Sequence, residues 1–288
     1  MSASFLYFLR FTLWVTWVFL RSFKLRDVTL RVTCISSRSL LYLRANLCHN
    51  ISMKIGIICA LEKEQKQLLA RLPGAEQRNF GPFVFYRFCQ NGNELIVTQS
   101  GIAKVNAAAC AVELINRFAP NAIINSGVAG GLNPQLNSLD VVAGSQYVHH
   151  DVFCGPENEW GQVQGLPSFF QGDKNLLATV EALQKEGRFS RPVHTGLICT
   201  GEQFITDPQA LQSIVQRFPK ALACDMESAS FAQVCYMYQV PFLSFRVISD
   251  VVGKETNNAQ QYENFWENVA HAAFENTWTF VMAVLSGK

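Results

Sequence analysis

The chain has 288 residues, of which 49% are hydrophobic and 16% charged, and this composition predicts a sizeable core within one or two domains. Residues 1–52 hold seven of the 24 basic and one of the 22 acidic residues, which leaves residues 53–288 with a net charge of −4. A mildly acidic body argues against nucleic acid as a partner. Its seven scattered cysteines form no C-x-x-C pair, which argues against a disulfide framework or a zinc site and indicates a reducing compartment.

Residues 1–52 differ from the rest of the chain. Residues 5–20 are apolar, but Arg10 interrupts them and basic residues follow, so the run is too short for a typical membrane span. A secretory signal would carry its positive charge before the apolar run. A signal anchor stays open; we favour an over-extended gene start with Met53 as the natural first residue. We therefore predict an extension over 1–52 and a cytoplasmic domain over 53–288 that has no membrane contact.

Strands and helices alternate after Met53. Residues 54–60 predict a buried strand, and residues 61–72 have helical periodicity with Glu64 in the first turn, where a carboxylate complements the helix dipole. Residues 83–89 and 94–98 predict a hairpin around an Asn-Gly-Asn turn.

The next segments predict a helix and a turn that approaches a ligand. A helix is expected up to residue 118, and its first turn, residues 100–104, is suited to an anion or to a simple cap. Residues 122–126 predict a strand. Residues 127–131 (G-V-A-G-G) predict a glycine-rich turn that lets a ligand come close to the backbone, although the G-x-G-x-x-G spacing is absent.

The middle of the chain contains a possible metal motif and a long loop. A strand over 139–148 leads into His149-His150-Asp151. Adjacent side chains on an extended strand point to opposite faces, and no third ligand has suitable spacing, so we expect no metal there. Residues 154–170 predict an aromatic, Gly/Pro-rich loop suited to a lid or a subunit contact.

The following segments predict two helices, a strand and a polar turn. Helices are expected over 174–187 and 208–218, with a strand over 193–199 between them. The turn at residues 200–205 carries Phe204, which is suited either to the core or to stacking on a flat ligand.

The stretch 223–250 aims two carboxylates at one edge of the sheet. Glu227 opens a helix, and Asp250 follows the apolar run 242–248, which predicts a strand buried on both faces. The carboxyl ends of strands form the ligand-binding edge of an open α/β sheet. One long helix is expected over 257–285, and the alternation as a whole predicts a single α/β domain.

Six motifs occur in order along residues 53–288: M-K-I-G-I-I-C-A-L-E-K-E, S-G-I-A-K-V-N-A-A, I-N-S-G-V-A-G-G, T-G-E-Q-F-I, A-C-D-M-E-S-A-S-F-A and F-R-V-I-S-D. With these motifs the chain resembles bacterial 5'-methylthioadenosine/S-adenosylhomocysteine nucleosidases of the nucleoside phosphorylase superfamily. The resemblance implies a single-domain three-layer α/β/α sandwich around a central mixed, twisted sheet. It also implies hydrolysis of the N-glycosidic bond of these nucleosides by a homodimer that uses no cofactor and no metal.

The resemblance gives catalytic roles to two acids. Glu64 corresponds to the general acid/base that activates water, and Asp250 to the acid that protonates purine N7. Cleavage passes through an oxocarbenium-like state, so the adenine must leave as a neutral or protonated base, and only a protonated Asp250 can donate to N7. A free Asp titrates near about 3.9, so this role needs a pKa raised by a partly buried environment.

The remaining matched positions correspond to substrate-binding residues. Glu227 would hold the ribose 2'- and 3'-hydroxyls, with Met226 beside the sugar, and Arg246 would help to orient Glu64 and the water. Phe204 would stack on adenine, while the backbone of Ile205 would meet the adenine edge. The set is completed by Val128, Ala129, Gly130 and Ser249.

The chain departs from the family pattern in two places. Val128 stands where many relatives have a hydroxyl residue, and phosphorolytic members have an arginine and a serine at the positions of Asn125 and Val128, so water is favoured as the nucleophile. Residues 154–167 also differ from well-known members, in a region that covers a neighbouring subunit's site in this family. Open alternatives are a phosphorylase, a hydrolase of 5'-deoxyadenosine or aminodeoxyfutalosine, and a non-catalytic nucleoside-binding protein.

Overall fold

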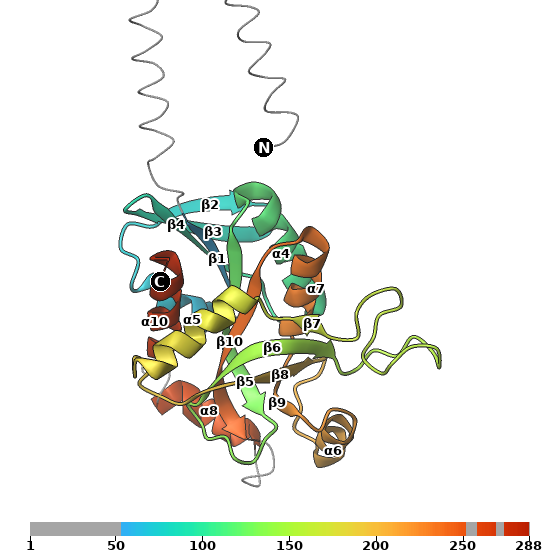
Figure 1. Ribbon diagram of the computed structural model, residues 1–288. Helices are drawn as coiled ribbons and strands as arrows, with labels where there is room; N and C mark the ends of the chain where they lie inside the picture. The colour runs from blue at the N-terminus through green and yellow to red at the C-terminus, as the bar shows by residue number, and fades with distance from the viewer. Residues whose placement is uncertain (1–52, 252–257, 269–273, 288) are drawn as a thin grey trace, which may run out of the picture. The chain divides into compact units, whose positions relative to one another are not determined.

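The computed structural model describes residues 53–251, 258–268 and 274–287 (Figure 1). The strands are β1 (Lys54–Cys59), β2 (Glu76–Phe80), β3 (Phe83–Gln90), β4 (Asn93–Gln99), β5 (Ala122–Gly131), β6 (Val141–His149), β7 (Phe170–Gln171), β8 (Val193–Thr200), β9 (Ala221–Asp225) and β10 (Phe242–Val251). The helices are α3 (Glu62–Leu69), α4 (Lys104–Phe118), α5 (Lys174–Lys185), α6 (Pro208–Arg217), α7 (Ser228–Tyr238), α8 (Asn258–Asn268) and α10 (Glu275–Leu285).

The strands form one mixed sheet that partly closes on itself. Its order is β10-β6-β8-β9-β5-β1-β4-β3-β2, and β10 pairs with β5 as well as with β6. The strands β10, β6, β8, β9 and β5 therefore form a closed ring, from which β1, β4, β3 and β2 extend. This confirms the α/β class and the mixed sheet, and it adds a closure that the sequence does not predict.

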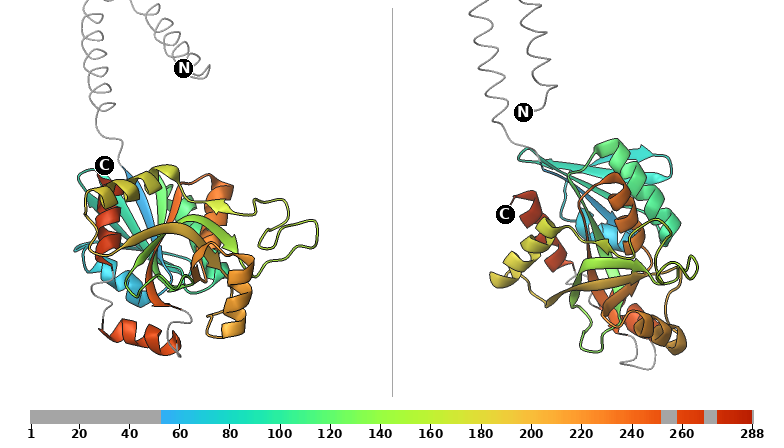
Figure 2. Two further views of the ribbon diagram at one scale, coloured as in Figure 1. Left: turned by 60° about the horizontal axis from the view of Figure 1, so that its bottom comes forward. Right: turned by 45° about the vertical axis from the view of Figure 1, so that its right-hand side comes forward.

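Helices cover the sheet on both sides (Figure 2). One apolar cluster joins β1, β4 and β10 to α3, α5 and α10. A second cluster joins the same sheet to α4 and α7. Alternate side chains of a strand point to opposite faces, so strands such as β1 feed both clusters, with Ile57 in the first and Ile58 in the second.

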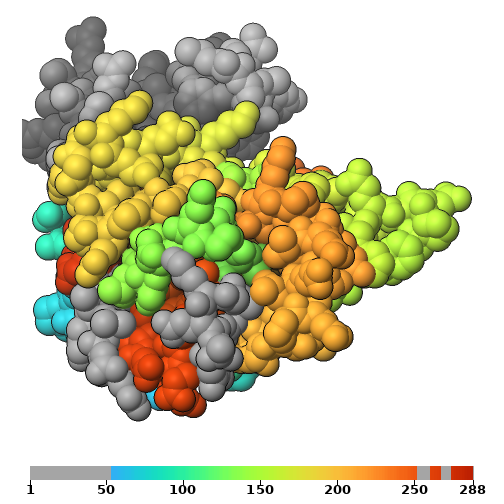
Figure 3. All heavy atoms as spheres, turned by 90° about the horizontal axis from the view of Figure 1, so that it is seen from below, coloured from blue at the N-terminus to red at the C-terminus, as the bar shows by residue number. Residues whose placement is uncertain are grey.

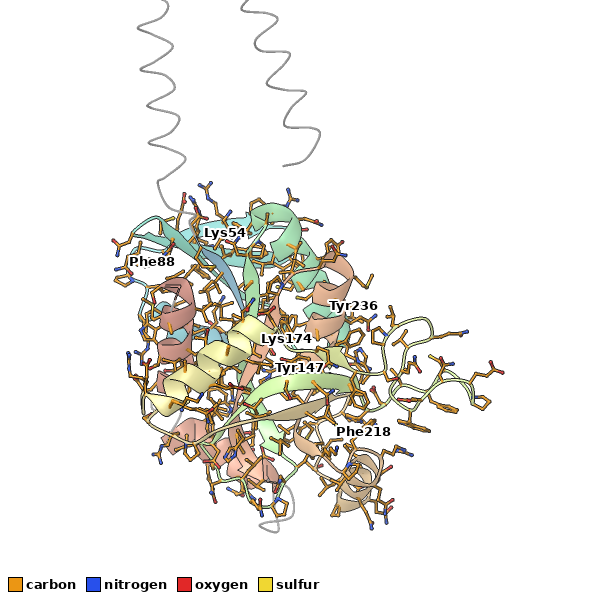
Figure 4. The ribbon with its side chains drawn as sticks, viewed as in Figure 1. Lys54, Phe88, Tyr147, Lys174, Phe218 and Tyr236 are labelled. Carbon is orange, nitrogen blue, oxygen red and sulfur yellow. The ribbon has the colours of Figure 1, made fainter. Side chains whose placement is uncertain are left out.

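Local chemistry shapes the hairpin of β3 and β4 and the bulge in β6. The predicted hairpin is confirmed: β3 and β4 pair in register up to Gln90 and Asn93, and the two turn residues, Asn91 and Gly92, both have positive φ. On β6, Tyr147 (Figure 4) donates its hydroxyl to the Gly144 carbonyl at 2.7 Å. A Cβ at Gly144 would lie 2.3 Å from the tyrosine ring, so this bulged position requires glycine.

Two predictions about elements are wrong. The glycine-rich segment is not a turn, because β5 continues through Gly131 and pairs there with both β9 and β10. The helix expected over 257–285 is replaced by α8 and α10, and α10 begins after Phe274. Residues 269–273 between these helices lie outside the described residues, as do the extension over 1–52 and its possible anchor.

The loop between β6 and β7 extends away from the sheet (Figures 1 and 3). Within it, the rings of Phe153 and Trp160 stack with centroids 4.9 Å apart, and the Arg217 guanidinium lies 3.9 Å from the centroid of Trp160. The predicted loop is therefore tied to α6 at its base. In the part of the chain that the structure describes, every helix is too short or too polar to cross a membrane.

Candidate active site

A cavity of about 250 Å³ lies at the carboxyl ends of β1, β5, β9 and β10. This is the sheet edge that the sequence selects. The start of α3, the residue Ile102 before α4, the loop residue Phe204 and Tyr262 of α8 close its sides. A smaller cavity adjoins it and is lined by Phe204, Ile205, Met226 and Asp250, among others.

Glu64 lies buried at the start of α3 with its carboxylate held by backbone groups. Its Oε2 accepts hydrogen bonds from the N–H groups of Ala60 and Leu61, each at 2.9 Å. Its Oε1 accepts one from the Val128 N–H at 3.0 Å. Burial raises the pKa of Glu64, while the Arg246 charge and these backbone donors oppose the rise in pKa. The donors favour the ionised form, which is the form a general base needs.

Arg246 is fully buried on β10 and joins two further carboxylates. Its Nη2 lies 2.9 Å from Glu227 Oε2 and 2.7 Å from Asp225 Oδ2. The other oxygen of Glu227 accepts a hydrogen bond from the Ala103 N–H at 2.9 Å. Burial raises the pKa of Glu227 to about 7, a rise that Arg246 opposes and the Asp225 charge reinforces.

Asp250 lies near the end of β10, beside the glycine-rich part of β5. Burial raises its pKa to about 6, against the effect of the Ser249 hydroxyl, which donates to Oδ1 at 2.6 Å. A Cβ built on Gly130 would lie 3.5 Å from Asp250 Oδ2. The second oxygen of Asp250 thus faces the narrow space beside Gly130, where the two cavities adjoin.

An aromatic pair covers the outer side of the cavity. Phe204 is 51% exposed, and its ring meets that of Tyr262 edge to face with centroids 5.4 Å apart. Ile205, in contrast, is buried in the apolar cluster beneath the loop. A half-exposed phenyl ring at a cavity mouth is available to a flat ligand, whereas a core phenylalanine is not.

The structure brings all the predicted site residues together. The main cavity is lined by Glu64, Val128, Ala129, Gly130, Phe204, Met226, Glu227 and Ser249. Ile205 and Asp250 line the adjoining cavity, and Arg246 lies behind both, in contact with Glu227. Their individual roles stay predictions.

Other residues of the site were not selected from the sequence. Leu61, Ile102 and Tyr262 line the cavity, but apolar residues and a tyrosine on a helix give no sign that separates a pocket wall from a core. Asp225 and Cys224 also line it. The triplet Asp225-Met226-Glu227 was a usable signal for Asp225, because two acids around a turn rarely sit together unless a cation joins them.

The adjacent histidines His149 and His150 lie buried at the end of β6 and just after it. His149 Nε2 lies 2.9 Å from Gln233 Oε1, and burial lowers the pKa of both His149 and His150. Within the described ranges, no group of three His, Cys, Asp or Glu side chains could hold a metal ion.

Comparison with known proteins identifies the family. A family model of the Phosphorylase superfamily matches residues 54–282. The 5'-methylthioadenosine/S-adenosylhomocysteine nucleosidase of Bacillus cytotoxicus is 39% identical over 234 residues, which cover 81% of this chain and 98% of the relative. A nucleosidase of this name from Colwellia psychrerythraea 34H, solved in complex with adenine, is 33% identical, has a TM-score of 0.73, and is matched over 82% of this chain and 95% of its own. The futalosine hydrolase of Helicobacter pylori strain 26695 is 27% identical with a TM-score of 0.74, over 83% of this chain and 99% of its own. The chain therefore belongs to the phosphorylase superfamily and, within it, to the 5'-methylthioadenosine/S-adenosylhomocysteine nucleosidases, which are N-glycosyl hydrolases.

Proposed function

We propose that this chain hydrolyses the N-glycosidic bond of 5'-methylthioadenosine and S-adenosylhomocysteine, releasing adenine and the corresponding 5-thioribose. The observation that carries the proposal is the placement of three buried carboxylates, Glu64, Glu227 and Asp250, around adjoining cavities. Each stands on a different element and has a different set of partners, so each is suited to a different task.

Asp250 acts as the general acid for the leaving base. A raised pKa of about 6 leaves roughly a tenth of this carboxyl protonated at pH 7, against less than about a thousandth for an unshifted Asp, and only the protonated form donates to purine N7. The rise in pKa from 3.8 to about 6 means that the folded environment disfavours the ionised form of Asp250 by about 3 kcal/mol. Ser249 fixes Oδ1, which leaves Oδ2 to face the base.

Glu64 acts as the base that activates water. Its three backbone donors and the nearby guanidinium favour the ionised form and oppose the rise in pKa that burial causes. Arg246 Nη1 has no hydrogen-bond partner within the described residues, and Gly127 lies beside both this atom and Glu64 Oε1. A water held between these groups would be positioned for attack on the anomeric carbon.

Glu227 accepts hydrogen bonds from the ribose hydroxyls, and the apolar groups position the rest of the nucleoside. Met226 packs beside the sugar, Phe204 stacks on the adenine, and the Ile205 backbone meets its edge. Val128, Ala129 and Gly130 form the floor. No step in this sequence of events requires a cofactor.

The direct test is adenine release from 5'-methylthioadenosine by the 53–288 protein, first in phosphate-free buffer and then with phosphate added. We expect release at the same rate in both, with free methylthioribose as the second product. Release only with phosphate would make the protein a phosphorylase. The full-length chain, assayed in parallel, shows whether residues 1–52 alter the rate.

A second candidate function is hydrolysis of a different adenosine derivative. It is favoured by the likeness to a futalosine hydrolase, which has a TM-score as high as 0.74. Competition by 5'-deoxyadenosine and aminodeoxyfutalosine against 5'-methylthioadenosine distinguishes the two, because the preferred substrate has the higher kcat/KM.

We also propose that the chain acts as a cytoplasmic homodimer. Large apolar side chains lie exposed at the start of α4, at the end of α7 and on the loop after β6, namely Ile102, Val105, Phe153, Tyr236, Met237 and Tyr238. Side chains of this kind are enriched at subunit contacts. The described cysteines are free thiols, which is in keeping with a reducing compartment. Sedimentation equilibrium tests the oligomeric state.

A further inference from the structure

Asp225 is a buried carboxylate at the end of β9 that the proposed reaction does not use. Its side chain is 2% exposed, and its oxygens are occupied by donors from four residues. Thr200 Oγ1 donates to Oδ1 at 2.6 Å, the Ser228 hydroxyl donates to Oδ2, and the Glu227 N–H lies 3.3 Å from Oδ1. Arg246 donates from Nε at 2.8 Å. With this many donors around it, the Asp225 carboxylate has no lone pair left for substrate.

The guanidinium of Arg246 has its orientation set by this contact. One oxygen, Asp225 Oδ2, lies 2.8 Å from Nε and 2.7 Å from Nη2, so this contact spans two nitrogens of the guanidinium and restrains its rotation. With that rotation restrained, Nη2 is shared with Glu227, and Nη1 is directed toward Gly127 and Glu64. Without Asp225, the guanidinium could rotate toward Glu227 or Glu64, and the spacing of the two functional carboxylates would no longer be set.

The charges of this cluster lead to the same conclusion. Glu64 on α3, Asp225 on β9 and Glu227 before α7 surround one cation on β10, so the cluster holds more negative than positive charge. The other titratable groups that interact with members of this cluster are Lys63 on α3, His150 just after β6, the thiols of Cys59, Cys199 and Cys224, and the hydroxyls of Tyr147 and Tyr262. Without the Asp225 charge, Arg246 would lower the pKa values of Glu64 and Glu227 further.

We propose that Asp225 is a positioning residue which, by fixing the Arg246 guanidinium, sets the geometry and the ionisation of Glu227 and Glu64. The proposal rests on the proposed nucleosidase function of the same site. It assigns Asp225 no contact with the reacting atoms.

The test compares three variants of the whole chain: Asp225→Asn, Asp225→Glu and Thr200→Val. We expect Asp225→Asn to lower kcat/KM for 5'-methylthioadenosine at least about 30-fold, the size of effect seen when an outer partner of a functional group is lost. The Asp225 charge raises the pKa of Glu227, so neutralising it should move the acidic limb of the pH profile for nucleoside binding to lower pH by about 0.5 unit or more.

The other two variants separate charge from structure. Thr200→Val removes one donor to Asp225 and keeps the charge, so its acidic limb should stay at the wild-type pH even if the rate falls. Asp225→Glu also keeps the charge but displaces the guanidinium, so it should lose rate with an unmoved limb. If Asp225→Asn fails to fold, Asp225→Glu provides the test of the positioning role. A kcat/KM in Asp225→Glu equal to that of the wild type would overturn this role. An unmoved limb in a folded Asp225→Asn overturns the effect on ionisation.

A binding measurement keeps this proposal separate from the proposed function. A 7-deazapurine nucleoside lacks the N7 acceptor but keeps the ribose that Glu227 would hold. Its affinity, measured by calorimetry against pH, should drop at least about tenfold in Asp225→Asn, while that of free adenine should change less than about twofold. If the wild-type chain does not turn over methylthioadenosine, the reaction assignment fails and these affinities still decide the role of Asp225. Equal losses for nucleoside and adenine would contradict it.

Discussion

At the scale of single residues, Ala103 holds an unusual backbone conformation next to Glu227, the carboxylate that we propose binds ribose. Its φ is 77° and its ψ 168°, a region that is essentially restricted to glycine. In this conformation its N–H points at Glu227 Oε1, at 2.9 Å. The strain therefore coincides with a contact that orients a functional group, as is common at active sites.

Replacing Ala103 by glycine should stabilise the fold. A non-glycine residue in this region costs about 1–3 kcal/mol of strain, which glycine removes. Glycine also gives the unfolded chain more conformational entropy, which offsets part of this stabilisation, so we expect the free energy of unfolding to rise by about 1 kcal/mol. Urea unfolding of the 53–288 protein measures this. Ala109→Gly, on the exposed side of the same helix, is the control and should lose about 1 kcal/mol, because its backbone is helical. A loss of stability in Ala103→Gly would mean that the conformation is not strained.

Asp250→Asn isolates the proposed general acid. Asparagine cannot transfer a proton to N7, so kcat should fall by about 10²–10⁴-fold, the usual contribution of such a group. The basic limb of kcat/KM, which comes from ionisation of the Asp250 carboxyl, should disappear. Calorimetry with adenine checks that the variant still binds the base. Turnover within tenfold of wild type would remove Asp250 from this role.

At the scale of elements, the glycines of β5 make room for the site. A Cβ on Gly127 would lie 2.3 Å from Arg246 Nη1 and 2.7 Å from Glu64 Oε1, whereas one on Gly131 would have its nearest neighbour at 3.2 Å. These glycines are needed for close approach within a strand, since β5 continues through them.

The two positions give a matched pair of substitutions. Gly127→Ala should reduce kcat/KM by at least about 10²-fold, because the methyl group displaces both Glu64 and the guanidinium from their contacts. Gly131→Ala should cost less than about tenfold, since only small side-chain shifts are needed there. Circular dichroism shows that each variant is folded. Equal losses in the two variants would count against a specific clash at Gly127.

Elements with strong local signals were predictable from the sequence, and elements set by distant contacts were not. The hairpin follows from Asn91-Gly92, and α4 ends within a residue of its expected position. The glycines of β5 were taken for a turn, because single-sequence rules cannot see the strands β9 and β10 that pair with them. The ring closure between β10 and β5 is likewise a long-range pairing.

The same distinction holds for the site. Glu64, Glu227 and Asp250 were identified because acids at element ends and family motifs mark them. Tyr262, from α8, could not be identified, since only the fold brings its ring to Phe204.

At the scale of the whole molecule, Asp250 links catalysis to the stability of the fold. Its pKa is raised on folding from 3.8 to about 6, so its stabilising effect is fully present below pH 3.8 and is lost as the pH rises through about 6. Burial lowers the pKa values of His149 and His150, so their contribution to the free energy of unfolding increases with pH over part of this range. The overall pH dependence of stability therefore does not report Asp250 alone.

A difference measurement removes the other groups. We expect the Tm of Asp250→Asn, relative to that of the wild type without ligand, to rise by about 4 °C between pH 5 and pH 8. The physical reason is that the wild type loses about 1.4 kcal/mol as the Asp250 carboxyl ionises over this range, and asparagine does not. Differential scanning calorimetry of both proteins provides the data. A constant Tm difference would show that the pKa of Asp250 is not raised by folding.

The closed ring of strands also bears on aggregation. An open sheet edge offers unpaired backbone groups to other chains, but each strand of the ring has a neighbour on both sides. Among the described residues, β7 also pairs with one strand only, β6, but it is two residues long and too short to serve as a template; the longer strand with an open edge is β2, which pairs only with β3. It is short, polar and largely solvent-exposed, with an ion pair between Glu76 and Arg78. Such a strand is a poor template for intermolecular pairing, so this architecture confines the hazard of edge-to-edge fibril growth to one strand that charged side chains protect.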